Sequence, residues 1–318
     1  NTMKKKTRPI KDIILLPFVY FSALVMRIVT KTGVKRLPLS RNALLQVGVF
    51  PIRNHYYQPQ FDYRGVSEDF SSQRKLPGLD LNTAGQLDFL DTLTYADELV
   101  GIPDEKSGDG VFYWNNGSLA PGDAEYWYQV VRHLKPRRIV EIGSGFSTLL
   151  ALRALNKNRE EDAAYECEHV CIEPYEMPWL EKTGVTVKRQ KVEELDLEYF
   201  AGLAEGDILF IDSSHIIRPA GDVLFEYLQI LPVLKPGVVV HVHDIFTPYN
   251  YPLIWFRENV KFWNEQYLLE AILSNGREWE ILAALNYLQH NHHDALKKVC
   301  PKLTTQNEPG SLYMKKRG

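Results

Sequence analysis

The stretch RIVEIGSGFST at residues 138–148 decides the fold of this chain. A basic residue leads into an apolar run with an acid near its end, a Gly-x-Gly turn follows, and residues 149–155 continue as a helix. This order of strand, acid, glycine turn and helix forms the nucleotide-binding corner of an open α/β sheet. The glycines let a ligand approach the main chain, and the start of the helix offers free N–H groups to an anion.

Short apolar segments continue this pattern through the second half of the chain. Nearly continuous apolar strands that alternate with helices are typical of a parallel sheet covered on both faces. The sequence therefore predicts an α/β, Rossmann-like, doubly wound sheet. Strands are expected at 138–142, 170–173, 185–188, 207–211, 238–242, 279–284 and 311–314, and the clearest helices at 124–134, 146–155 and 223–231.

Composition excludes some functions. The chain has 318 residues, 45% of them hydrophobic and 24% charged, as in ordinary globular proteins. A formal charge of −3 gives no electrostatic case for binding nucleic acid. Three cysteines are too few and too far apart for a zinc site, and we interpret them as reduced thiols in a cytoplasmic protein.

The N-terminal part differs from the rest. The run Ile13–Met26 is uncharged, contains a proline and has basic residues on both sides. It is shorter than the roughly 20 residues of a spanning helix and lacks the cleavage site of a signal peptide. Two interpretations stay open: a membrane-surface or signal-anchor helix, or a helix packed on the domain or on a partner. The expected organisation is a basic and apolar leader at 1–36, an arm with a helix at 37–104, and the main domain at 105–318.

Acids at the ends of the first two predicted strands point to an adenosine-containing ligand. Glu141 precedes the turn that contains Gly143 and Gly145. A dinucleotide fold would have a third glycine where this chain has Thr148, which argues against a nicotinamide cofactor. Glu173 ends the second strand, where a carboxylate can accept both ribose hydroxyls.

Together with the predicted strands at 207–212 and 311–314, these residues resemble the class I S-adenosylmethionine-dependent methyltransferases over roughly residues 105–318. The resemblance implies a seven-stranded sheet with the last strand antiparallel, and S-adenosylmethionine as cofactor. We expect the cofactor to be contacted by Glu141, Gly143, Ser144, Gly145, Glu173 and Asp212.

A second polar group follows the fourth and fifth predicted strands. Asp212 and His215 lie in FIDSSH at 210–215, and His243 and Asp244 lie in VHVHDI at 240–245. Because adjacent parallel strands bring their carboxyl ends to one crevice, we expect these side chains to converge. Carboxylates and imidazoles are ligands for a divalent cation, and a histidine beside a hydroxyl can take its proton.

This pattern is similar to the metal-dependent O-methyltransferases that act on sugar hydroxyls in macrolides. The likeness implies His215 as general base, with Asp212 and Asp244 as further catalytic residues. It also implies Mg²⁺ or another divalent cation at Asp212, His243 and Asp244. In that family a Glu precedes the last Asp, whereas this chain has His243, so a role for His243 as a second base or hydrogen-bond donor is the alternative. A plain hydrogen-bond network at the strand ends is the alternative for the whole group.

Aromatic residues follow the fifth strand in FTPYNYP at 246–252 and FWNEQY at 262–267. With the preceding HDIF at 243–246, they resemble a bacterial methyltransferase subgroup often of unassigned substrate. Rings flanked by amides can stack on a sugar or a phenol, but the i, i+4 spacing of Trp263 and Tyr267 favours packing in a helix. His241 is expected to be buried and satisfied. Residues 55–57 and 114–116 are expected to cover the pocket.

The sequence thus predicts transfer of a methyl group from S-adenosylmethionine to a hydroxyl of a sugar, glycan or small molecule. A nicotinamide-dependent oxidoreductase and a non-catalytic, membrane-associated scaffold are the alternatives. The expected location is cytoplasmic or peripheral on the inner membrane face. The residues name neither the acceptor nor the oligomeric state, and a homo-oligomer stays open.

Overall fold

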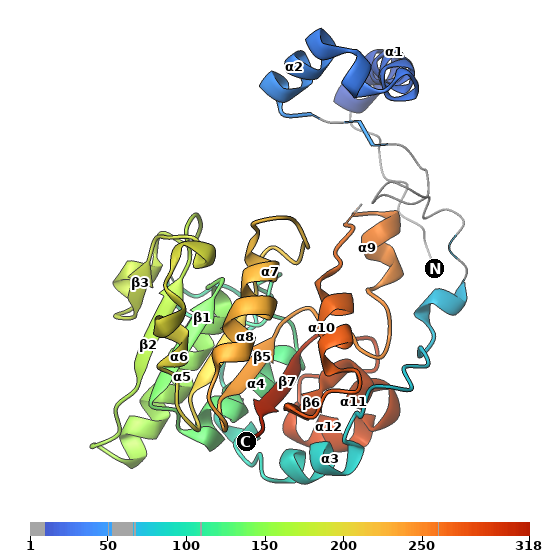
Figure 1. Ribbon diagram of the computed structural model, residues 1–318. Coiled ribbons are helices and arrows are strands. Elements are labelled where there is room, and N and C mark those ends of the chain that lie inside the picture. The colour runs from blue at the N-terminus through green and yellow to red at the C-terminus, as the bar shows by residue number, and fades with distance from the viewer. Residues whose placement is uncertain (1–9, 50, 53–65, 67, 109, 260) are drawn as a thin grey trace. The chain divides into compact units, whose positions relative to one another are not determined.

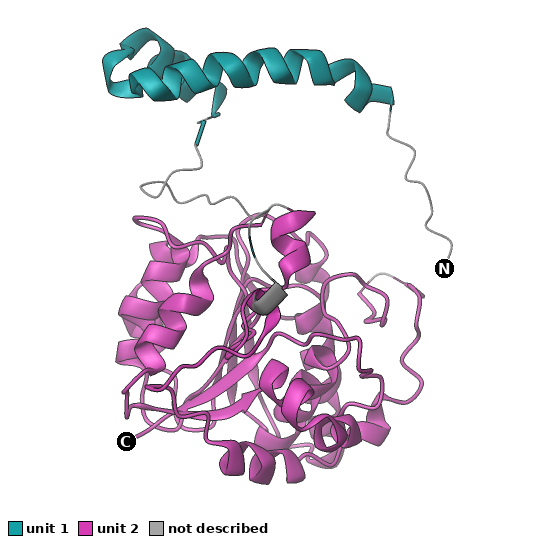
Figure 2. Ribbon diagram, turned by 90° about the vertical axis from the view of Figure 1, so that its right-hand side faces the viewer, with its two compact units in different colours: residues 1–67 teal, residues 68–318 magenta. Residues whose placement is uncertain are grey.

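The computed structural model of the chain describes residues 10–49, 51–52, 66, 68–108, 110–259 and 261–318. The chain divides into two compact units, residues 1–67 and 68–318, which are coloured separately in Figure 2. The sequence analysis placed the start of the main domain at 105. In the structure, residues 68–104 belong to the second unit, because Leu90, Leu93 and Leu99 are buried in its core.

One seven-stranded sheet organises the second unit, in the order β3-β2-β1-β4-β5-β7-β6 (Figure 1). Strands β1 to β5 pair in parallel, whereas β7 runs antiparallel to both of its neighbours. The predicted Rossmann-like sheet with an antiparallel last strand is therefore confirmed. The strands are β1 (Arg138–Ile142), β2 (Glu168–Ile172), β3 (Thr186–Lys188), β4 (Ile208–Ile211), β5 (Val239–Val242), β6 (Trp279–Ala284) and β7 (Leu312–Lys316).

Helices cover both faces of this sheet. Side chains of α3, α4, α5, α11 and α12 pack on one face, and those of α6, α7, α8 and α10 pack on the other. The helix expected at 223–231 is divided, because a π-helical turn at Glu226–Ile230 separates α7 from α8. The α-helices of this unit are α3 (Thr83–Asp91), α4 (Asp123–Leu134), α5 (Phe146–Glu161), α6 (Leu197–Ala201), α7 (Asp222–Phe225), α8 (Leu231–Val233), α9 (Leu253–Arg257), α10 (Glu265–Leu273), α11 (Leu285–Asn291) and α12 (His293–Val299).

The period-two alternation of the strands sends neighbouring residues into opposite cores. In β1, Ile139 joins the core under α4 and α5, whereas Val140 joins the core under α6 and α8. In β4, Phe210 joins the first core and Leu209 the second. Both faces are therefore apolar, which explains why the strands are apolar throughout rather than alternating with polar residues.

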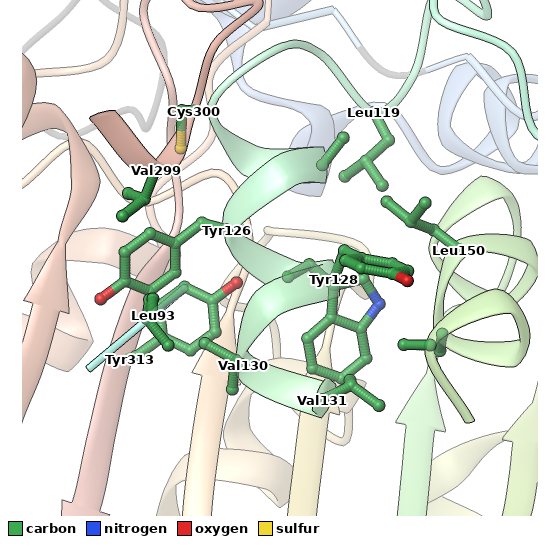
Figure 3. Packing of buried hydrophobic residues seen from close by; sticks show 14 of the residues in the cluster. Leu93, Leu119, Tyr126, Tyr128, Val130, Val131, Leu150, Val299, Cys300 and Tyr313 are labelled. Atoms are coloured by element: carbon green, nitrogen blue, oxygen red, sulfur yellow. The ribbon is translucent and has the colours of Figure 1, made fainter. Parts of the chain in front are cut away.

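Helix α4 lies at the centre of one core, and every residue from Asp123 to Arg132 is buried. Figure 3 shows its tyrosines and valines packed among side chains from the loops, α5, α12 and β7. The indole N–H of Trp127 donates a hydrogen bond to the carbonyl of Ser147, 3.1 Å away, in the first turn of α5. The same ring lies 5.2 Å from that of Phe210 in β4. Trp127 thus links α4 to the corner that follows β1.

The first unit contains α1 (Ile10–Thr32), a 3₁₀ turn at Val34–Arg36 and α2 (Pro38–Val47). Helix α1 has 23 residues, so it extends beyond the apolar run from which the sequence analysis judged its length. By length and composition it is the one helix in the described part of the chain that could cross a membrane.

We predict that Trp127→Ala lowers the free energy of unfolding by about 3–5 kcal/mol, because it opens a cavity and frees the Ser147 carbonyl. Urea denaturation of the purified protein measures this. Trp179→Ala is the matched control, since Trp179 is only partly buried, and it should cost about 1–2 kcal/mol. Equal losses for the two variants would contradict a central role for Trp127.

Candidate active site

The hydrogen-bond ladders of the sheet continue one residue past the ends of three strands. The amide of Gly143 donates to Ile172 at 3.0 Å, that of Asp212 to Ile142 at 2.8 Å, and that of His243 to Ile211 at 2.9 Å. These bonds bring the segments after β1, β4 and β5 to the same edge, as expected for parallel strands.

Gly143 joins the first two of these segments closely. It has a φ of 78°, and a Cβ atom placed there would lie 1.8 Å from the carbonyl oxygen of Asp212. Only glycine tolerates both the left-handed backbone and the contact. Gly145 is different, because its φ of −176° is extended and a Cβ would meet only Met177, at 3.7 Å. The glycine at 143 is thus required by the fold, whereas the one at 145 leaves open space beside the pocket.

Two adjoining pockets open above these strand ends. One, of about 550 Å³, is lined by residues 143–147, by Glu173 and by the polar groups after β4 and β5. The other, of about 410 Å³, lies over the end of β2 and the segment after β3. Gly143, Glu173 and Asp212 line both pockets, so the two adjoin along these residues, and the pair is called the crevice below. A larger hollow, of about 690 Å³, lies over α5 and Trp179, away from the strand ends.

His215 lies at the centre of the polar group that the sequence predicted. Its Nε2 atom is 3.3 Å from Asp212 Oδ1 and 3.7 Å from Asp244 Oδ2. The imidazole is almost fully buried, whereas the side chains of Asp212 and Asp244 are 36% and 22% exposed. Both carboxylates therefore meet the pocket, and the less exposed imidazole lines it as well. The structure brings these three predicted residues together.

Glu265, at the start of α10, holds the other side of the ring. Its Oε2 atom lies 2.7 Å from His215 Nδ1, and its Oε1 atom accepts a hydrogen bond from the Tyr227 hydroxyl at 2.8 Å. The loop is fixed to the same helix, since the carbonyl of His215 accepts the amides of Asn264 and Glu265. This contact favours a proton on Nδ1, and Nε2 lies on the pocket side of the ring, near Asp212 and Asp244.

Charge in this cluster is balanced between carboxylates and imidazoles. Burial lowers the pKa of His215, but hydrogen bonds to Asp212 and Glu265 outweigh it and hold that pKa well above the usual value. Burial raises the pKa of Asp244. For Asp212, His243 and His215 overcome the effect of burial and lower the pKa. The free site therefore favours an imidazolium between carboxylates.

Two of the site residues have strained backbones. His215 has a φ of 60° and Asp244 a φ of 57°, a region that side chains other than glycine visit rarely. Each such residue costs about 1 kcal/mol, which the surrounding contacts must offset. Neither residue needs this backbone to continue a strand.

His243 is oriented differently from the other three residues. Its Nδ1 atom is 3.3 Å from Ser311 Oγ, which donates to the buried carboxylate of Asp123 at 2.6 Å. Burial raises the pKa of Asp123 to about 6. The potential ligand atoms of Asp212, His215 and Asp244 all lie within 4.8 Å of one another, and His243 is not part of that group. The geometry of the described residues therefore differs from the predicted ligand set of Asp212, His243 and Asp244.

The predicted cofactor residues divide into two groups. Gly143, Ser144, Gly145, Glu173 and Asp212 all line the crevice. Glu173 accepts the backbone amides of Tyr175 and Glu176 at 3.0 and 2.9 Å, which fixes its carboxylate at the end of β2.

Glu141 is fully buried and lines neither of the two pockets. Its carboxylate accepts a hydrogen bond from Thr148 and lies 3.6 Å from both Cys171 Sγ and His169 Nε2. Strand alternation explains this position, because Glu141 points to the α5 side, beneath the turn. Its geometry supports a role in holding the turn.

The aromatic residues after β5 also differ from the sequence interpretation. Helix α10 begins only at Glu265, so Trp263 precedes the helix and the i, i+4 argument does not apply. Trp263 lines the pocket and its ring centroid lies 4.1 Å from that of His215. Lys261 lies over the same indole at 4.0 Å. Trp255 lines the pocket as well.

Other expectations met mixed outcomes. His241 is buried as expected, but neither ring nitrogen has a hydrogen-bond partner among the described residues, and the ring stacks on Tyr313 at 4.2 Å. Burial holds the pKa of His241 well below the usual value, so its imidazole is neutral.

Of the two segments expected to cover the pocket, residues 55–57 lie outside the described residues. Trp114 is buried away from the pocket, and the following residues 117–119 line it instead.

Comparison with known proteins identifies the domain that contains these residues. Residues 140–245 match a family model described as a methyltransferase domain. A protein of Archaeoglobus fulgidus, described as uncharacterized, is 32% identical over 174 residues, which make up 50% of this chain and 76% of that protein. This chain carries a methyltransferase domain, as its sequence predicted. A methyltransferase domain decides against the nicotinamide-dependent oxidoreductase.

Solved structures with some likeness to this methyltransferase include two O-methyltransferases. TomG of Streptomyces achromogenes, in complex with SAM, is 17% identical, with 73% of this chain and 90% of TomG covered and a TM-score of 0.37. An O-methyltransferase of Bacillus cereus, in complex with SAH, is 13% identical. The match covers 73% of this chain and 91% of that protein, with a TM-score of 0.38.

The sequence analysis missed several residues of the methyltransferase site. Glu265 was quoted only as part of an aromatic stretch, and no spacing rule connects it to His215, 50 residues earlier. Tyr227 lies inside the helix expected at 223–231, and Asp123 lies just before the one expected at 124–134, so neither was considered. The signal available in the sequence was an acid, Glu265, in a stretch otherwise rich in aromatic residues.

We predict that Gly143→Ala destabilises the methyltransferase by at least about 2 kcal/mol and abolishes binding of S-adenosylmethionine, because the Cβ atom would force Asp212 away. Calorimetric melting and isothermal titration with S-adenosylmethionine measure the two effects. Gly145→Ala is the control, and its melting temperature should stay near that of the wild type. An unchanged melting temperature for Gly143→Ala would show that the two loops are not in contact.

Proposed function

We propose that this methyltransferase transfers the methyl group of S-adenosylmethionine to a hydroxyl oxygen, with His215 as the general base. The observation that carries the proposal is the position of His215, whose Nε2 atom faces the pocket between two carboxylates while Glu265 fixes Nδ1. A sugar, a glycan or a small hydroxylated molecule is the proposed acceptor class.

The crevice offers a place for each part of the cofactor. Glu173 lies where the ribose hydroxyls of an adenosine would bind, in the pocket that also contains Val192 and Glu193. Residues 143–147 form the other side, where the start of α5 offers N–H groups to a carboxylate. Asp212 lines both pockets and stands between donor and acceptor.

In the proposed step, an acceptor hydroxyl oxygen attacks the sulfonium methyl carbon. The new C–O bond forms as the C–S bond breaks, and its electron pair leaves with sulfur as S-adenosylhomocysteine. The hydroxyl proton moves to His215 Nε2. Alignment of donor and acceptor supplies much of the acceleration, and the positioned base contributes about 10²–10⁴-fold. The cationic sulfonium would offset the nearby carboxylates and so favour the neutral imidazole.

The carboxylates of Asp212 and Asp244 also fit a divalent cation. Both are partly exposed to the pocket and are close enough to share one ion, and Mg²⁺ binds through one or two carboxylates with water or substrate oxygens. Such a cation would orient an acceptor hydroxyl and lower its pKa. His243 is engaged with Ser311, and we assign it no ligand role. His215 is within ligand distance, but its pairing with Glu265 supports the role of base.

We predict that His215→Asn lowers kcat by about 10²–10⁴-fold while affinity for S-adenosylmethionine changes little. Glu265→Gln should lower kcat less, because the amide fills the same space without favouring the Nδ1 proton. Release of S-adenosylhomocysteine with a panel of nucleotide sugars, sugars and phenols identifies an acceptor and then measures both variants. His290→Asn, whose parent side chain pairs with Glu308 away from the crevice, should behave as wild type. Full turnover by His215→Asn would exclude it as the base.

We predict that exhaustive dialysis against EDTA lowers methyl transfer strongly and that added Mg²⁺ restores it. Asp244→Asn should weaken this response, because it removes one charged ligand. The same assay of S-adenosylhomocysteine release measures both. Full activity after dialysis would rule out a role for the ion, while leaving the base and the methyl transfer in place.

A further inference from the structure

The first unit of this methyltransferase has almost no core of its own. Among its described residues only Val29 is buried, although α1 and α2 are rich in large apolar side chains. Leu39 and Val47 in α2 are 84% and 75% exposed, and Phe18 and Phe21 in α1 are 68% and 70% exposed. A soluble unit would expose such side chains to water at a large free-energy cost. These helices therefore need an apolar environment from outside their own unit.

The distribution of apolar residues around α1 indicates what that environment is. Ile13, Ile14, Leu15 and Leu16 follow one another at about 100° per residue, so they point to all sides of the helix, and each is 47–61% exposed. A groove on a protein covers one stripe of a helix. A lipid bilayer surrounds all sides, and a helix that is apolar all round is typical of that solvent.

Length and charge agree with lipid. Helix α1 has 23 residues, and the mean hydropathy of its most apolar 18-residue window is 2.1. At a rise of 1.5 Å per residue, the length of the helix is about equal to the thickness of the hydrocarbon core of a bilayer. Five basic residues and no acidic one lie between Ile13 and Val49, in a chain whose formal charge is −3. These five, Arg27, Lys31, Lys35, Arg36 and Arg41, are all exposed. Each basic residue near an anionic leaflet adds to binding.

We infer that the first unit is a membrane anchor, with the apolar part of α1 that precedes Arg27 inserted in the hydrocarbon of a bilayer and the basic segment from Arg27 to Arg41 at anionic headgroups. This goes beyond methyl transfer. It places the enzyme at a lipid surface, so that hydroxyl acceptors carried by that surface are concentrated near it. A second copy of the chain or the methyltransferase unit itself, as alternative covers for α1, would each bury only part of its circumference.

Flotation of the full chain with vesicles tests this inference. Wild-type protein should float with vesicles of phosphatidylcholine and phosphatidylglycerol and remain bound in high salt. Leu16→Asp with Phe21→Asp should stay at the bottom of the gradient, because each aspartate in the hydrocarbon lowers partitioning on the order of 50-fold or more. Val100→Asp with Leu228→Asp is the matched control, since both parent residues are exposed on the second unit, and it should float as wild type.

Replacing Lys35, Arg36 and Arg41 together by Gln should remove any preference for vesicles that contain phosphatidylglycerol over those of phosphatidylcholine alone. Titration with S-adenosylmethionine confirms in every variant that the second unit is folded, so failure to float is distinct from failure of the enzyme. Wild-type protein that stays unbound with both vesicle types would overturn the inference. So would a soluble dimer that the paired aspartates dissociate, because a second copy would then cover α1.

Discussion

The close contact between Gly143 and Asp212 is the constraint on which the site depends. A side chain at 143 would bring a carbon to 1.8 Å from the Asp212 carbonyl, so the turn after β1 and the segment after β4 can meet only because the first has no side chain there. Their meeting sets Asp212 between the two pockets. It also places the cofactor-binding turn beside His215 and Asp244. One missing Cβ atom thus fixes the distance between the turn after β1 and the segment after β4.

Electrostatics and strain follow from this arrangement. Asp212, Asp244 and Glu265 surround one buried imidazole, and two of the four residues have left-handed backbones. Such strain persists only where the surrounding contacts determine it, and here the bonds from Asn264 and Glu265 to the carbonyl of His215 do so. Asp212 and Asp244 therefore meet the pocket while Glu265 holds the far side of the ring.

Local signals predicted much of the fold because they act over short distances. β1 and β6 were predicted to the residue, and the other strands to within about two residues. Apolar runs and helix starts depend on neighbouring residues, so they can be read without the fold. The expected helix at 223–231 contains a π-helical turn. The second unit begins before the expected domain boundary at 105, because α3 packs against β6. The domain boundary depends on this contact with a distant part of the chain.

By itself, the sequence determined the parallel sheet, the glycine turn, and the convergence of Asp212, His215 and Asp244, because the carboxyl ends of adjacent parallel strands must share one edge. It could not determine the direction of Glu141, the partner of His215 Nδ1, or the place of Trp263 beside that ring. Those depend on which face of a strand is covered and on where α10 begins, and only the packed tertiary structure decides either. The reason is physical: a side chain acquires its partner from segments that folding brings near, and the spacing of residues along the chain does not encode that proximity.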